Sequence, residues 1–446
     1  MARTSLKLIL LIVLSALAVA QSGSQTTKIT LLKVGRLLDV RAGKYLANQG
    51  VLIENEKIKE VGPLASVQAH APKDAAVVDL SNATVLPGLI DCHAHVFIAA
   101  GPNSPGENML LAVAGMSAST RALLGARLAR EDLEAGFTTI RNIGHSGIDG
   151  DAALRDAVNQ SWVPGPRVLA SCRKLTPPGG QAVRLNPVLA DKITEQEFLA
   201  VGSPDEAHKA VRENLLYGAD FIKVVADADR RFVTLEEMKA IVEEAHRSGL
   251  KVAVHATTPL GIKTAVDAGV DSIEHGDEVT DDELKAMHDK GIFFDITEGF
   301  YGGRLRSLLQ KSVVLSPEVD QELAAWEKKD ATATPARIQR IMKAGVKFAA
   351  GSDMWFDYPD KTRGQATATM FGALHDLGMQ PIDIVRAATL NAAEMIGCQD
   401  RVGAIEPGKL ADLIATRGDP LQDVTELERV RFVMRGGTVV RNEVKP

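Results

Sequence analysis

Eight short apolar segments dominate the middle of the chain, each about as long as a β-strand, and they alternate with segments of helical periodicity. In order they are GLIDCHAHV (88–96), FTTIRNIG (137–144), RVLAS (167–171), FIKVVAD (221–227), KVAVHAT (251–257), DSIEHGD (271–277), IFFDIT (292–297) and KFAAGSD (347–353). This alternation predicts an α/β protein with a parallel sheet covered by helices, and eight strands favour a closed (β/α)8 TIM barrel. A doubly wound open sheet is the alternative, although no Gly-x-Gly-x-x-Gly follows a strand to indicate a dinucleotide site.

Both ends of the chain have the pattern of short strands joined by tight turns. QGVLIENEKIKEVGP near the start predicts a hairpin, and RVRFVMRGGTVVRN near the end has Arg-Gly-Gly between two apolar runs. Neither end is large enough to form a stable sheet alone. We therefore expect residues 28–85 and 402–446 to combine into one small β-sandwich domain that flanks a barrel of residues 86–401.

The first 20 residues have the features of a signal peptide. Arg3 and Lys7 precede an apolar run from Leu8 to Ala20 that ends in a small-x-small pattern, and this run is short for a transmembrane helix. An uncleaved anchor is the alternative. We expect an exported protein, periplasmic or secreted, with no stable membrane association after cleavage; its three cysteines leave open whether two form a disulfide.

Polar residues stand at the ends of five of the predicted strands, where the active site of a TIM barrel forms. They are His93, His95, Lys223, His255, His275 and Asp353. Histidine nitrogens and a carboxylate suit Zn²⁺ or a similar divalent ion, and the i, i+2 spacing places His93 and His95 on one face of their strand. Taken singly, each histidine is also compatible with a structural role, and Asp353 with a helix cap.

Lys223 is the most informative of these residues. An ammonium group between Ile222 and Val224 on a central strand is desolvated, which lowers its pKa and favours a neutral, nucleophilic amine. Such an amine can react with CO₂ to give a carbamate whose two oxygens bridge two metal ions. An ion pair with Asp227 or another carboxylate is the alternative.

These residues, together with PGLIDCHAHV, GSD and the later EPGKLADLI, resemble the amidohydrolase superfamily over almost the whole chain from Lys28 to Glu443. Within it the chain is similar to the branch of imidazolonepropionase-like proteins, Xaa-Pro dipeptidases and ochratoxinase-type amidases. The resemblance implies two divalent ions, most simply zinc. His93, His95 and Asp353 would hold one ion, His255 and His275 the other, and N6-carboxylated Lys223 would bridge them.

The resemblance also implies a mechanism in which a hydroxide shared by the metals attacks a carbonyl group. Asp353 would take the hydroxide proton and pass it to the leaving amine, and His145 would hydrogen-bond the carbonyl oxygen or the oxyanion that develops from it. A loop histidine that faces solvent is the alternative for His145.

Substrate-binding residues are less clearly indicated. Gln181 stands where relatives often carry the histidine of Gly-Gly-His, and the loop after Lys223 looks shorter than in those relatives. Arg230 and Arg231 in that loop could bind a carboxylate, and Tyr301 could contact substrate; a solvated turn and simple packing are the alternatives.

The predicted function is hydrolysis of an amide, either the C-terminal peptide bond of a dipeptide or the amide bond of an N-acyl amino acid. The alternatives are cyclic amide hydrolysis of the imidazolonepropionase type, lactone or ester hydrolysis, and a non-catalytic barrel protein. With 51 basic and 57 acidic residues the net charge is −6, which favours a small-molecule substrate over nucleic acid and leaves open a homo-oligomer.

Overall fold

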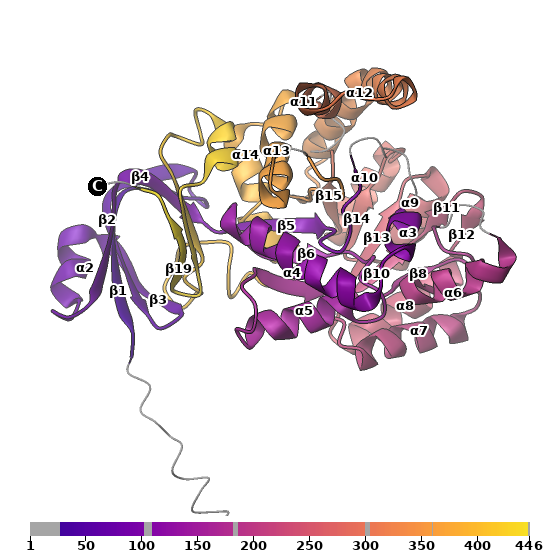
Figure 1. The fold of residues 1–446 in the computed structure, drawn as a ribbon, viewed down its shortest axis with the longest axis horizontal. Coiled ribbons are helices and arrows are strands. Elements are labelled where there is room, and N and C mark those ends of the chain that lie inside the picture. The colour runs from indigo at the N-terminus through magenta and orange to yellow at the C-terminus, as the bar shows by residue number, and fades with distance from the viewer. Residues whose placement is uncertain (1–26, 102–108, 182–185, 299–303, 359, 445–446) are drawn as a thin grey trace, which may run out of the picture.

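The computed structural model describes residues 27–101, 109–181, 186–298, 304–358 and 360–444. The predicted signal peptide lies outside these residues. The described chain has two parts, a β-sheet region built from both ends and an α/β region between them (Figure 1). None of its helices has the length and apolar character needed to cross a membrane.

A single seven-stranded sheet unites the two ends of the chain. Its order is β19(Thr438–Asn442), β18(Phe432–Arg435), β17(Leu413–Thr416), β4(Ala76–Pro87), β1(Ile29–Asp39), β2(Lys44–Glu54) and β3(Lys57–Pro63). Only the β1–β4 pair is parallel. The hairpin predicted in QGVLIENEKIKEVGP is confirmed as β2–β3, which turns at Asn55 with a φ of 56°. All seven strands belong to one hydrogen-bonded sheet, so their arrangement as a two-layered sandwich stays a prediction.

All eight predicted strands of the α/β region are present and parallel. One ladder contains β5(Leu89–Ala94), β6(Phe137–Asn142) and β7(Arg167–Ala170). The other runs in the order β16(Phe348–Ala350), β15(Phe293–Ile296), β14(Ser272–His275), β13(Val252–Ala256), β10(Ile222–Val225), β8(Lys174–Thr176) and β9(Phe198–Ala200). The α/β class with parallel strands is thus confirmed.

The third predicted strand is longer than expected and is divided in two. Its first half, β7, pairs with β6, whereas its second half, β8, pairs with β10. Cys172 lies between the halves with a φ of 57°, a left-handed conformation that interrupts a ladder. The other edges of the two ladders are β16 and β5. Just after β16, the Asp353 amide donates a 2.9 Å hydrogen bond to the carbonyl oxygen of His93 in β5. Closure of the two ladders into a continuous barrel stays a prediction.

Helices follow most of the strands and pack against the strands or against one another. They are α2(Leu64–His70), α3(Met109–Ala114), α4(Ala118–Glu134), α5(Gly150–Asn159), α6(Pro187–Glu197), α7(Pro204–Leu216), α8(Leu235–Arg247), α9(Pro259–Ala268), α10(Asp281–Lys290), α11(Arg304–Ser312), α12(Pro317–Lys343), α13(Arg363–Asp376), α14(Pro381–Ala387) and α15(Leu390–Met395), with the 3₁₀ helix η1(Val424–Arg429) and the short strands β11(Asp227–Ala228) and β12(Arg231–Phe232). Thr234 and Glu237 form a capping box at the start of α8, which fixes where that helix begins.

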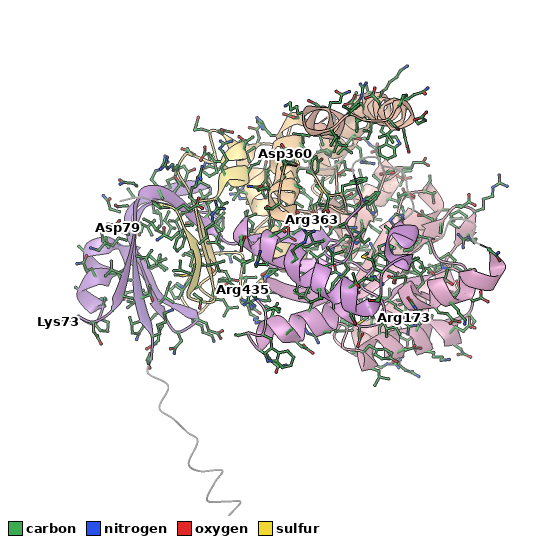
Figure 2. The ribbon with its side chains drawn as sticks, in the orientation of Figure 1. Lys73, Asp79, Arg173, Asp360, Arg363 and Arg435 are labelled. Carbon is green, nitrogen blue, oxygen red and sulfur yellow. The ribbon has the colours of Figure 1, made fainter. Side chains whose placement is uncertain are left out.

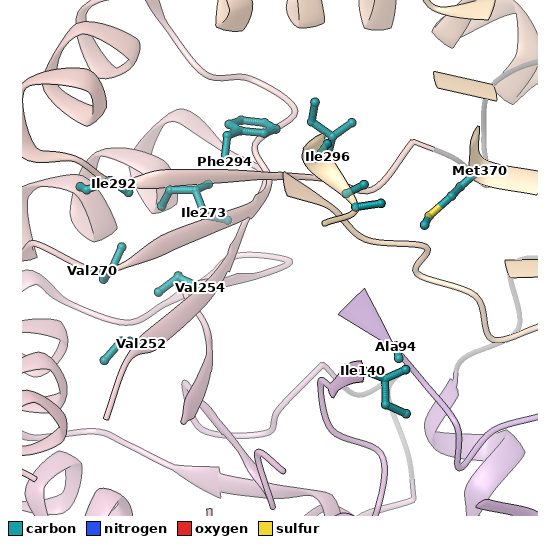
Figure 3. Close-up of a cluster of buried hydrophobic side chains, with 14 of the residues drawn as sticks. Ala94, Ile140, Val252, Val254, Val270, Ile273, Ile292, Phe294, Ile296 and Met370 are labelled. Carbon is teal, nitrogen blue, oxygen red and sulfur yellow. The ribbon is translucent and has the colours of Figure 1, made fainter. Parts of the chain in front are cut away.

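The core lies between the strands and these helices. Figure 3 shows Val254, Ile273 and Phe294 from three neighbouring strands within one cluster of buried apolar side chains. Each of these three side chains is fully buried. This close packing fixes the strands, so the residues at their carboxyl ends are held in defined positions.

Candidate metal centre

The six predicted metal ligands line one cavity of about 650 Å³. The histidines lie at or just after the carboxyl ends of β5, β13 and β14, Lys223 is the second residue of β10, and Asp353 lies just after β16. Residues that are far apart in the sequence therefore lie around one cavity, as expected for strands whose carboxyl ends form the active site.

The ligand atoms within this cavity are close to one another. Asp353 Oδ1 lies 3.2 Å from His95 Nε2 and 3.7 Å from His93 Nε2. The ring of His275 has its centre 4.9 Å from that of His93 and 4.5 Å from that of His255. His93, His275 and Asp353 each offer one ligand atom, and these three atoms lie within 4.8 Å of one another. One divalent ion could be bound by such a group.

The protonation states of the histidines favour metal binding here, because a histidine must be neutral to be a ligand. Burial is the main reason that the pKa of His93 falls to about 3, and the Lys223 charge lowers it further. Burial alone would raise the pKa of Asp353, but nearby His93 and a hydrogen bond with His95 lower it below its usual value. At neutral pH the centre therefore offers imidazole lone pairs and an ionised carboxylate.

Lys223 is the strongest sign that a further group belongs in this centre. Its side chain is 2% exposed, and its Nζ has no hydrogen-bond partner among the described residues. Burial lowers the pKa of Lys223 to about 8. An unpaired polar atom in a buried position is costly, so the donor set fits a carboxylated lysine with bound metal ions better than a free amine.

A buried network that the sequence reasoning missed orients His93. Glu274 Oε2 accepts a hydrogen bond from His93 Nδ1 at 2.9 Å, which leaves Nε2 directed toward Asp353. Arg141 lies 2.9 Å from Glu274 and 3.1 Å from Asp295. Burial and the neighbouring Glu274 raise the pKa of Asp295 well above its usual value, which favours the protonated form of this carboxyl group. A carboxylate that accepts a hydrogen bond from the far ring nitrogen of a metal-binding histidine commonly fixes the tautomer of that histidine in this way.

The backbone around the centre is unusually constrained. His145, His275 and Asp353 have φ values of 60°, 70° and 48°, in the left-handed region that non-glycine residues rarely adopt. Gly351, in the GSD motif, approaches β5 so closely that an added Cβ would lie 2.3 Å from His93 Cβ. The chain thus accepts local strain in order to aim these side chains.

His145 lies beside the centre, with its ring centre 5.5 Å from that of His95, but it does not line the cavity. Lys174 Nζ is 2.6 Å from His145 Nε2 and 2.5 Å from Gln181 Oε1. Lys174 and Gln181 are among the residues that line the cavity, and His145 is not. Burial lowers the pKa of Lys174 to about 7, with a further contribution from Lys223. Lys174 was not predicted as a site residue, because it follows the predicted end of its strand.

Two further substrate-binding candidates, Arg230 and Arg231, do not line the cavity. Arg230 is exposed, and Arg231 donates a 2.8 Å hydrogen bond to the Pro178 carbonyl oxygen; neither is among the residues that line the cavity. Tyr301 lies outside the described residues.

Arg363, labelled in Figure 2, supports the rim of the centre from the start of α13. It is buried, and its guanidinium donates to the carbonyl oxygens of His95, Met354 and Ile98. These bonds satisfy backbone acceptors just beyond β5 and β16, where the ladders end.

Comparisons with known proteins agree with this geometry. Residues 84–440 match the model of the Amidohydrolase family. The chain is 28% identical to ochratoxinase of Aspergillus niger over 94% of this chain and 88% of that protein. It is 25% identical to imidazolonepropionase of Fusobacterium nucleatum subsp. nucleatum, covering 83% of this chain and 85% of that protein. A solved Xaa-Pro dipeptidase with bound methionine in the active site is 28% identical, with a TM-score of 0.77 over 93% of this chain and all of that one.

Proposed function

Since the chain belongs to the amidohydrolase family, we propose that it hydrolyses the C-terminal peptide bond of a dipeptide or the amide bond of an N-acyl amino acid. One observation carries this proposal: the buried, unpaired amine of Lys223 lies in the same cavity as four histidines and Asp353. Similarity to an ochratoxinase and to an Xaa-Pro dipeptidase supports an amide as the bond that is cleaved.

Two divalent ions, most simply zinc, would be held by the residues of this cavity. His93, His95 and Asp353 would bind one, His255 and His275 the other, and Lys223 would bridge them as its carbamate. When bound, such ions lower the pKa of water and polarise a carbonyl group. Total metal analysis of the purified protein is expected to give about two ions per chain, as in other two-metal hydrolases.

The chain itself would supply proton transfer. Asp353 is ionised at neutral pH, and its Oδ1 lies 3.2 Å from His95 Nε2 at the base of the cavity. A carboxylate in this position can accept a proton from the attacking water and deliver it to the leaving amine. Replacement of Asp353 by Asn keeps the shape but removes the proton acceptor.

A substrate screen tests the proposed function. Zinc-loaded protein is incubated with a panel of dipeptides and N-acetyl-L-amino acids, and the released amines are quantified; Asp353→Asn serves as the inactive control. We expect cleavage of at least one member and none by the variant. Hydrolysis of lactones or esters without any amide would contradict the proposal, as would equal rates for the variant.

Three further points are proposals of the same kind. The two parallel ladders would form one closed (β/α)8 barrel, residues 1–20 would direct export to the periplasm or medium, and the mature protein would act on a small molecule without stable membrane association. N-terminal sequencing of the exported protein tests the second point, because a chain that retains Met1 contradicts it.

A further inference from the structure

A second buried lysine lines the same cavity as the candidate metal ligands. Lys174 is 2% exposed and stands on β8, the half-strand that follows the break at Cys172. Its ammonium group contacts His145 Nε2 and Gln181 Oε1, and it lies 5.1 Å from the centre of the Phe198 ring. All three partners are uncharged groups when His145 is neutral, and burial lowers the pKa of His145 well below its usual value.

The charge of Lys174 is therefore not balanced locally. No carboxylate forms an ion pair with it among the described residues, and nearby Glu197 is instead paired with Arg121 at 2.5 Å. Among the described residues that line the cavity, Arg337 is the third lysine or arginine, after Lys174 and Lys223. Arg337 forms ion pairs with both Asp277 and Glu298. A buried cation without a paired anion is expensive, whereas one that faces a cavity can be paired by a ligand.

The position of Lys174 indicates which part of a substrate it would meet. His145 Nε2 lies 2.6 Å from Lys174 Nζ, and the centre of the His145 ring lies 5.5 Å from that of His95. Lys174 is thus about one imidazole ring away from the candidate metal ligands. In an amino acid the carboxylate carbon lies two bonds, or roughly 2.5 Å, from the nitrogen. When the carbonyl group to be attacked is at the metal centre, the carboxylate of the leaving residue therefore lies farther from the metal ligands than that carbonyl group does.

We propose that Lys174 binds the carboxylate of the amino acid that leaves, with His145 and Gln181 as positioning residues that hold its ammonium group. This inference rests on the proposed function, because it names the end of the substrate that the site recognises. An ammonium–carboxylate bond is charge-assisted and stronger than one between neutral groups. A bound carboxylate also favours the protonated form of Lys174.

The test compares ligands that differ only in this charge. Binding of the twenty L-amino acids and of their twenty amides to the zinc-loaded protein is measured by calorimetry. Four variants are tested in parallel: Lys174→Met removes the charge, Lys174→Arg retains it, Arg337→Met removes the cation on the opposite wall, and Lys285→Met is a surface control at a side chain that is 74% exposed. Thermal unfolding of each variant confirms that it is folded.

We expect the best-bound amino acid to bind roughly 10- to 100-fold more tightly than its amide, as for one hydrogen bond between charged groups. Lys174→Met should remove most of this preference, and Lys174→Arg and Lys285→Met should keep it. The proposal is wrong if the wild-type protein shows no preference or binds no ligand of the panel. It is also wrong if Lys174→Met keeps the preference or if Arg337→Met alone removes it.

Kinetic measurements separate this inference from the proposed function. With N-acetyl-L-amino acids and their amides, acetate release reports cleavage of the acyl bond in both series. Cleavage with no preference for the acids would refute the role of Lys174 and leave the proposed function intact. Lys174-dependent binding of amino acids without cleavage of any amide would refute the proposed function and leave the carboxylate site standing.

Discussion

Replacement of Glu274 by Gln is expected to weaken metal binding much more than it weakens the fold. Glu274 accepts hydrogen bonds from His93 Nδ1 at 2.9 Å, from Ser272 Oγ at 2.6 Å and from Arg141 at 2.9 Å. Glutamine has the same shape but no charge, and one of its two polar atoms is a donor. The new amide group therefore meets the Arg141 guanidinium, which can only donate.

The size of the effect follows from these contacts. Loss of the charge behind His93 makes that imidazole a weaker ligand and loosens its orientation, which typically costs about 10- to 100-fold in metal affinity, or roughly 1.4–2.7 kcal/mol. The stability loss should be smaller than for a fully broken ion pair. The Glu274 charge helps to raise the pKa of Asp295, so its removal favours ionisation of Asp295, which lies 3.1 Å from Arg141.

Two measurements on the same samples distinguish these effects. Zinc affinity is obtained by competition with a chromophoric chelator, and the free energy of unfolding by urea denaturation of the zinc-free protein. Glu237→Gln is the matched control, because Glu237 is equally a buried glutamate with a hydrogen-bonding role, in the capping box of α8. It should lose about 0.3–1 kcal/mol of stability, because a negative charge near a helix N-terminus is removed, without a change in zinc affinity.

The reasoning is refuted if Glu274→Gln binds zinc as tightly as the wild-type protein. It is also refuted if both variants lose zinc affinity equally, since the effect would then come from general destabilisation. A loss of stability without a loss of affinity would show that Glu274 serves the fold and not the orientation of His93.

Three further predictions concern the centre and its surroundings. Lys223→Met should reduce the metal content below the two ions per chain that we propose for the wild-type protein, and an unchanged content in elemental analysis would exclude a bridging role for Lys223. Gly351→Ala should lower both zinc affinity and the unfolding temperature, because its Cβ would lie 2.3 Å from His93 Cβ; a wild-type affinity would show that the strand can shift freely. Burial raises the pKa of Asp132 to about 8, so the folded state binds a proton that the unfolded state releases, and stability falls as the pH rises from about 4 to about 8. Asp132→Asn, which keeps an acceptor for the Thr367 hydroxyl, should flatten this pH dependence in urea titrations, and an unchanged slope would contradict the assignment.

The strands of the α/β region were predictable because burial on both faces leaves a local pattern, a short apolar run between helices. The same logic finds strand ends, which is why the six candidate ligands could be named before their positions in space were known. The division of the third strand was not predictable. Arg173 and Lys174 interrupt its apolar pattern. The left-handed φ of Cys172 could not be predicted either, because cysteine has no preference for that conformation.

The residues that support the centre differ in how visible they are in the sequence. Glu274 and Asp295 are charged residues inside apolar strand segments, and this signal would have indicated a buried network. Their partner Arg141 gives the same signal in FTTIRNIG. Lys174 gives none, since its burial depends on how β8 packs against β10 and on the long-range contact with His145.

The shared sheet of the two chain ends has a consequence for folding kinetics. In β4, Val85 pairs with Ala415 of β17, so a strand made early in synthesis acquires its neighbour only when the last segments emerge. Contacts between such distant residues raise the contact order and slow folding, because a very long loop must close before they form. Until then β4 presents an open edge with unpaired amide and carbonyl groups. We therefore expect a nascent chain of this protein to require a chaperone that covers this edge. A C-terminal truncation before β17 would leave the edge exposed permanently.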